Sequence, residues 1–229
     1  TYEDGGAVRT AVYVVCQPSL EDEDDIGREV SHSGTPITLQ DHSDAVKIAV
    51  GTLSMILGLR GDFRCLLEEA AELHDQGKRD SRFQNMLGKT SSSATLLAKG
   101  ELGLSRGDIR RAYSWLGLTG WRHEQYSAAI AQASLGSDEN SNLVVRLVGT
   151  SHGHGRDMFA APGSTLTPDK VDDNIRRTMQ RLFDDGAWES IISQTNEGLG
   201  YWRVSYLEAL LRAADARVSA GEISWNSKE

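Results

Sequence analysis

The residues of this chain with the clearest capacity for chemistry are its histidines and two of its aspartates. Imidazole nitrogens bind transition metals and transfer protons near neutral pH, and carboxylates bind metals or act as bases. Gly77-Lys78 adds a cation close to one of these residues. The sequence holds six histidines, and five of them follow a definite order with the two aspartates: His42, His74-Asp75, His123, His152, His154 and Asp215.

Helical spacing predicts that these side chains point inward. His74 follows Ala70 and Ala71 on the apolar stripe of its segment, and Asp215 follows Leu211 by four residues. A single histidine on such a face is more simply interpreted as a core residue that hydrogen-bonds a neighbour. Several inward imidazoles and carboxylates together would be very costly unless a cation offsets their burial. The set therefore predicts one or two divalent cations at the centre of the fold.

The predicted ligands restrict the metal. Imidazole nitrogen and carboxylate oxygen suit Mn, Fe, Co, Ni or Zn, and Mg is a further possibility. Two such ions about 3.5–4 Å apart suit the hydrolysis of phosphodiester bonds. The two cysteines, Cys16 and Cys65, are far apart and are interpreted as core residues, which argues against a structural zinc site. We expect a divalent transition metal as cofactor, with two ions.

The ordered motifs resemble the HD superfamily of metal-dependent phosphohydrolases. Within it, they are similar to the HD nuclease domain of the type I CRISPR-associated nuclease-helicase, over roughly residues 39 to 219. The matching segments are Leu73-His74-Asp75-Gln76-Gly77-Lys78, Arg82-Phe83-Gln84, Arg122-His123-Glu124, the histidines His152 and His154, and Ala213-Ala214-Asp215-Ala216-Arg217.

The resemblance implies a function and a role for each ligand. Such domains degrade single-stranded DNA that a fused or partner helicase pulls from the target of an RNA-guided surveillance complex. By resemblance, the ligands of one metal are His42, His74, Asp75 and Asp215. Asp75 bridges to a second metal, whose other ligands are His123, His152 and His154. The implied catalytic residues are Asp75 and Lys78, and the lysine offsets charge on the phosphoryl oxygens.

The chain departs from the family pattern in two places. The family commonly has two adjacent histidines in its fourth motif, whereas Gly153 separates His152 from His154 here. His152 directly follows a predicted helix and is therefore the firmer of these two predicted ligands. The second departure is the segment 1–38, which precedes the first motif and which we expect to continue from an upstream helicase.

Side chains near the motifs are candidates for binding DNA. The predicted substrate-binding residues are Lys78, Arg82, Trp121 and Tyr126, because cations bind phosphates and aromatic rings stack on bases. The alternative is that the arginine is a solvated surface charge and that the rings belong to the core. The sequence has no phosphate-binding loop and no helicase motif, so it does not predict ATP-driven movement on DNA.

Helices must position these residues, because the chain has helical periodicity from residue 39 onward. The expected helices are 42–57, 63–76, 109–116, 124–135, 143–151, 169–183, 188–194 and 202–220, separated by glycine and serine. The β-branched and aromatic residues 8–15 predict a strand. We therefore expect an all-α, compact HD-type helical bundle at residues 39–229, preceded by an extension at 1–38 that includes a strand.

Charge and hydropathy limit the possible functions. The net charge is −9, whereas proteins that grip duplex DNA over a wide surface usually carry positive charge. A partner is therefore expected to deliver the DNA, or the strand enters a narrow groove. The sequence has no apolar run of about 18 residues and no secretory signal, which predicts a cytoplasmic protein without membrane attachment.

Two other functions remain open. The first is an HD phosphohydrolase of nucleotides or cyclic nucleotides, because a small substrate needs no basic surface. The second is a catalytically degenerate metal-binding module that serves only in interactions. Retention of the whole ligand set and of Lys78 favours an enzyme over this module.

Overall fold

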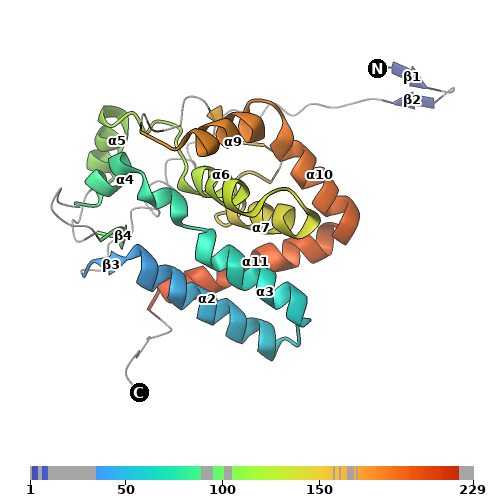
Figure 1. The fold of residues 1–229 in the computed structure, drawn as a ribbon, viewed down its shortest axis with the longest axis horizontal. Coiled ribbons are helices and arrows are strands. Elements are labelled where there is room, and N and C mark those ends of the chain that lie inside the picture. The colour runs from blue at the N-terminus through green and yellow to red at the C-terminus, as the bar shows by residue number, and fades with distance from the viewer. Residues whose placement is uncertain are drawn as a thin grey trace.

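A bundle of α-helices forms the body of the protein (Figure 1). The computed structural model describes residues 2–4, 7–9, 35–88, 95–100, 105–156, 158–159, 161–163, 168 and 170–221. The helices are α2 (Leu39–Ile56), α3 (Gly61–Leu73), α4 (Ser81–Met86), α5 (Arg106–Trp115), α6 (His123–Leu135), α7 (Glu139–Gly149), α9 (Asp173–Phe183), α10 (Ala187–Leu199) and α11 (Tyr201–Ser219), with a 3-10 helix, η1 (Gln76–Arg79). The prediction of an all-α bundle is confirmed.

Polar side chains fix where several helices begin. The hydroxyl of Thr38 accepts from the backbone N–H of Asp41 at the start of α2. Ser105 and Asp108 form a reciprocal capping box at the start of α5. Asp138 is the N-cap of α7 and Asp172 is the N-cap of α9. The carboxylate of each accepts hydrogen bonds from backbone N–H groups of its helix. These caps satisfy donors that a helix N-terminus otherwise leaves unpaired.

Helices α6 and α7 occupy the middle of the bundle, and the other helices pack around them (Figure 1). Every residue of α6 from His123 to Gln132 is buried. Helix α2 packs on both α3 and α11, and η1 packs on α6. The interior is formed by aliphatic side chains such as Leu67, Val144, Leu147 and Leu211, none of which is exposed. Burial of these apolar surfaces supplies the main driving force for the fold.

Two short antiparallel strand pairs complete the described structure. Strand β1 (Tyr2–Asp4) pairs with β2 (Ala7–Arg9), and β3 (Ile37–Thr38) pairs with β4 (Leu97–Lys99). The β3–β4 pair ties the start of α2 to the segment after α4. The side chain of Gln84 strengthens this tie, because its amide donates to the carbonyls of Lys78 and Leu97 and its oxygen accepts from the N–H of Leu97.

The observed structure differs from the predicted one in several respects. The helix predicted at 63–76 ends at Leu73, and η1, α4 and β4 follow where no element was expected. The predicted strand at 8–15 overlaps β2 only at residues 8 and 9, and its remaining residues and Cys16 lie outside the described part of the chain. Cys65 is exposed on α3, so its interpretation as a core residue is wrong. No described helix combines the length and apolar character needed to cross a membrane.

Candidate metal centre

Six of the seven predicted ligands converge in the interior of the bundle. Three helices (α2, α6 and α11), the turn between α3 and η1, and the turn after α7 supply them. Within the described residues they form two groups, and the ligand atoms of each group lie within 4.8 Å of one another. The first group is His42, His74 and Asp215, and the second is Asp75, His123 and His152. His152 and Asp215 are half-buried, and the other four are buried.

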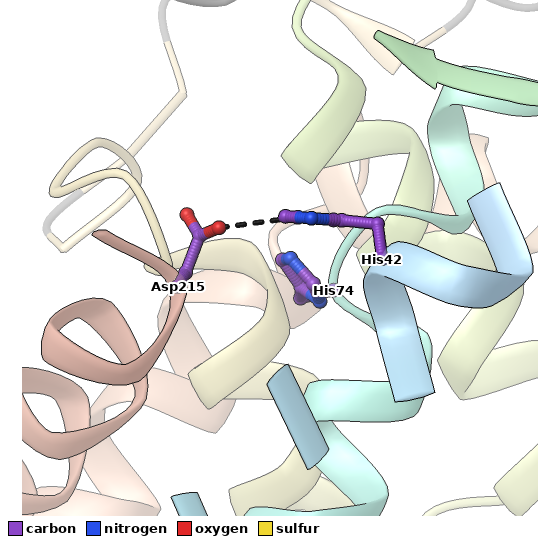
Figure 2. Close-up of side chains that lie close together, drawn as sticks. All are labelled: His42, His74 and Asp215. Atoms are coloured by element: carbon purple, nitrogen blue, oxygen red, sulfur yellow. Dashed lines mark ion pairs between the residues drawn. The ribbon is translucent and has the colours of Figure 1, made fainter. Parts of the chain in front are cut away.

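The first group joins three helices, as Figure 2 shows. His42 belongs to the first turns of α2, His74 directly follows α3, and Asp215 belongs to the last turns of α11. The Nε2 atom of His42 lies 3.1 Å from Oδ1 of Asp215. The hydroxyl of Ser219, one turn further along α11, donates to the same carboxylate oxygen at 3.2 Å.

The second group brings α6 and the end of α7 to the turn between α3 and η1. His123 begins α6, and its Nε2 atom lies 3.0 Å from Nε2 of His152, which follows α7. The Nε2 atom of His123 also lies 3.2 Å from Oδ1 of Asp75. Two imidazole nitrogens and one carboxylate oxygen therefore face a common point.

The carboxylate of Asp75 connects the two groups. Its Oδ1 atom faces His123, while its Oδ2 atom lies 3.4 Å from Nε2 of His42 in the first group. Oδ2 also accepts from Nζ of Lys78 at 2.7 Å. One fully buried carboxylate thus presents one oxygen to each group, which is the arrangement expected of a ligand shared by two cations.

The hydrogen bonding of His74 tests whether a cation fits this site. Its Nδ1 atom lies 2.7 Å from the carbonyl oxygen of Ala71, so Nδ1 carries the proton and Nε2 presents a lone pair. Nε2 has no hydrogen-bond partner in the described part of the chain, and the nearby Oδ2 of Asp75, at 3.6 Å, is also an acceptor. A cation between two such acceptors would satisfy both, and the backbone bond at Nδ1 is the usual way in which a metal-binding histidine is oriented. The residues present therefore fit a metal.

The electrostatics keep the carboxylates of Asp75 and Asp215 charged. Burial raises the pKa of Asp75, but the nearby His74, Lys78 and His123 outweigh it and hold this pKa well below its usual value. Burial likewise raises the pKa of Asp215, and the hydrogen bond from His42 reverses the effect and lowers it. Metals bind deprotonated ligands, so ionised carboxylates are in the form required.

The pKa values of two of the imidazoles are lowered as well, which for a histidine favours the neutral form. Burial lowers the pKa of His74. Burial and the neighbouring ring of His123 lower the pKa of His152 to about 4. Both rings are therefore neutral at physiological pH, which is the protonation state in which imidazole binds a metal.

A close approach at Gly77 holds η1 against α6. The N–H of Gly77 donates to the hydroxyl of Ser127 at 2.7 Å. A methyl group at Gly77 would overlap the carbonyl oxygen of His123. The glycine that follows the His74-Asp75 doublet is therefore required for packing, because it lets Asp75 and His123 lie side by side.

His154 belongs to neither group. It is half-buried and follows Gly153, whose φ of 87° places the backbone in the left-handed region. That region favours glycine, so the turn between the two histidines is specified by the residue that separates them. His152 alone of this pair joins the ligands.

The predicted DNA-binding side chains have different environments. Lys78 lies beside Asp75, as expected. Arg82 binds both carboxylate oxygens of Asp80, at 3.1 and 2.7 Å. Trp121 and Tyr126 are only 2% and 5% exposed. The structure thus places both rings in the core instead of at a surface where bases could stack, which corrects their predicted role.

Two further residues near the centre were not singled out from the sequence. Glu124 is fully buried, with Oε2 3.5 Å from Nδ1 of His123. It could have been found from the Arg122-His123-Glu124 motif. Lys99 on β4 is buried and donates to the carbonyl of Ser219 at 3.2 Å; burial lowers its pKa. No sequence signal marks Lys99.

A scan of protein-family models and searches of curated proteins and of solved structures found no match for this chain. The resemblance to HD nuclease domains therefore depends on the sequence motifs alone.

Proposed function

We propose that this chain is a metal-dependent nuclease of the HD type that hydrolyses phosphodiester bonds of single-stranded DNA in CRISPR interference. One observation carries the proposal: the buried carboxylate of Asp75 lies between two groups of imidazole and carboxylate ligands and presents one oxygen to each. Two cations that share a carboxylate suit displacement at phosphorus, because they can offset charge on both the attacking and the leaving oxygen.

The two groups would hold two divalent cations. His42, His74 and Asp215 would bind one, His123 and His152 would bind the other, and Asp75 would contact both. Nitrogen and oxygen donors suit Mn, Co, Ni or Fe, and Mg is possible. When bound, such cations lower the pKa of a water molecule and polarise phosphoryl oxygens.

The protein's own side chains supply position and charge. Lys78 is 6% exposed and contacts Asp75, so its ammonium group lies at the edge of the centre, where it would bind a phosphoryl oxygen of the substrate. Glu124 would hold the ring of His123 in place. The carbonyl of Ala71 fixes which nitrogen of His74 faces the centre.

The acidic composition indicates how DNA reaches the site. With a net charge of −9, the chain has little general attraction for a polyanion. We therefore propose that a helicase, in the same or in a partner chain, feeds the single strand to the centre within an RNA-guided surveillance complex in the cytoplasm.

The test uses circular single-stranded DNA with Mn²⁺ or Co²⁺, with and without a chelator. Wild type is expected to cut the circle only with metal, and Asp75→Asn is expected to lose cleavage and metal binding while its circular dichroism spectrum remains helical. His154→Ala is the matched control, because this histidine lies outside both ligand groups. Cleavage that survives the chelator or Asp75→Asn would refute the proposal.

The same net charge favours a second candidate function, hydrolysis of nucleotides or cyclic nucleotides. A small substrate needs no extended basic surface. Release of phosphate or of a nucleoside monophosphate from a nucleotide panel, with DNA left intact, would establish this function in place of the first. If the purified protein binds a transition metal but hydrolyses neither DNA nor any nucleotide, a catalytically degenerate metal-binding module is the better description.

A further inference from the structure

We propose that Arg212 binds a phosphate of the DNA strand adjacent to the one being hydrolysed, and that Gly153 keeps open the space that its guanidinium occupies. The inference rests on the proposed function and deepens it. It defines the substrate as one that carries a second phosphate next to the scissile one.

Arg212 lies at the rim of the metal centre. It belongs to α11, three residues before the ligand Asp215, and residues at this spacing lie on the same face of a helix. A methyl group built on Gly153 would lie 2.6 Å from Nη1 of Arg212. Gly153 directly follows the ligand His152. The guanidinium therefore lies against a segment that carries one ligand, while its own helix carries another.

Other arginines near this end of the bundle are already held by carboxylates. Arg146 and Arg156 both bind Glu208, and Arg82 binds Asp80. The exposed side chain of Arg212 has no hydrogen bond or ion pair with any residue in the described ranges. An arginine at the rim of the centre is thus available for a ligand.

The chemistry of this ligand follows from the guanidinium group. Its planar set of N–H donors matches the oxygens of a phosphate and can bind two of them at once. The metal ligands would hold the phosphate that reacts, so a cation beside them would contact the next phosphate of the strand. A substrate with one isolated phosphodiester would gain nothing from Arg212, whereas an oligonucleotide would.

This arrangement also gives a physical reason for the glycine between His152 and His154. Any side chain at position 153 would meet the guanidinium of Arg212 and displace it. The φ of 87° at this residue adds a backbone cost for other amino acids. The glycine between the two histidines therefore leaves space for the guanidinium of Arg212.

The experiment compares two substrates in the presence of Mn²⁺: a short single-stranded oligonucleotide and bis(p-nitrophenyl) phosphate, which has a single phosphodiester. Arg212→Gln is expected to raise KM for the oligonucleotide at least about tenfold, the worth of a charge-assisted hydrogen bond. Its activity on bis(p-nitrophenyl) phosphate is expected to match wild type, and Arg212→Lys should recover part of the loss. Arg203→Gln is the matched control, because Arg203 is exposed near the other end of the same helix.

A second readout is the salt dependence of DNA binding. Loss of one phosphate contact reduces the slope of log K against log salt by about 0.7 for a single strand. An unchanged KM and slope in Arg212→Gln would overturn the inference, and so would an equal loss on both substrates. If wild type hydrolyses neither substrate, the proposed function fails, and an unchanged affinity of Arg212→Gln for labelled single-stranded DNA then overturns the inference separately.

Discussion

Replacing Gly77 with alanine is expected to push apart the two halves of the metal centre. The added methyl group would overlap the carbonyl oxygen of His123, and the N–H of Gly77 would be pulled from its 2.7 Å hydrogen bond with Ser127. His123 and Ser127 both belong to the beginning of α6, the helix that also carries a candidate metal ligand. The change therefore acts on Asp75 and His123 without removing either side chain.

The expected loss in the free energy of unfolding depends on how far the backbone of α6 must move to admit the methyl group. Overpacking a buried contact typically costs about 1–3 kcal/mol. We expect the upper end, about 3 kcal/mol, because the blocking atom is backbone of a helix that is buried all round from His123 to Gln132. For a domain of this size that corresponds to a fall in Tm of about 6–12 °C.

Thermal unfolding of the chelator-treated protein measures this loss, and a Mn²⁺ titration measures the accompanying fall in metal affinity. Gly198→Ala is the matched control, because no atom lies within 4 Å of the added methyl and Gly198 is inside α10. That variant should be unchanged or stabilised by up to about 1 kcal/mol, the usual gain from glycine to alanine within a helix. A Gly77→Ala protein with wild-type Tm and wild-type Mn²⁺ affinity would refute the reasoning.

Three further predictions concern charge. Glu208→Gln leaves the buried Arg146 without its carboxylate and should cost about 3–5 kcal/mol in urea unfolding; a loss of less than about 1 kcal/mol would contradict it. Lys78→Met should lower kcat about 100-fold while the metal content stays the same, and an unchanged kcat would exclude a role on the phosphate. Because His74 and His152 bind protons more weakly in the folded than in the unfolded chain, the metal-free protein should be most stable above pH about 6.5 and lose stability as pH falls toward 4. Urea midpoints at a series of pH values check this, and a midpoint that rises as pH falls would contradict it.

The helices could be predicted from the sequence because their apolar residues repeat at helical spacing. The same spacing placed His74 and Asp215 on inward faces, and the structure brings them together with His42. The order of the motifs along the chain predicted Asp75, His123 and His152, which form the second group, and also His154, which belongs to neither group. These features are local or depend on residue type, so no knowledge of the packing was needed.

Other features depend on packing between distant segments. The pairing of Ile37–Thr38 with Leu97–Lys99 involves too few residues to show an alternating pattern. Periodicity could not show which way Tyr126 faces, because α6 is buried on all sides from His123 to Gln132 and no polar face marks the exterior there. Trp121 lies between α5 and α6, where helical spacing does not apply. The closeness of Arg212 to Gly153 joins segments far apart in the chain, and Arg212 has no sequence signal of its own.

The most direct test of the account is the electron paramagnetic resonance spectrum of the protein saturated with Mn²⁺. If Asp75 connects two ligand groups, the protein binds two Mn²⁺ ions per chain, and their spectrum shows the exchange coupling of ions about 3.5–4 Å apart. Asp75→Asn should remove that coupling. A wild-type protein that binds no Mn²⁺, or that binds ions without coupling between them, would contradict a centre built around this shared carboxylate.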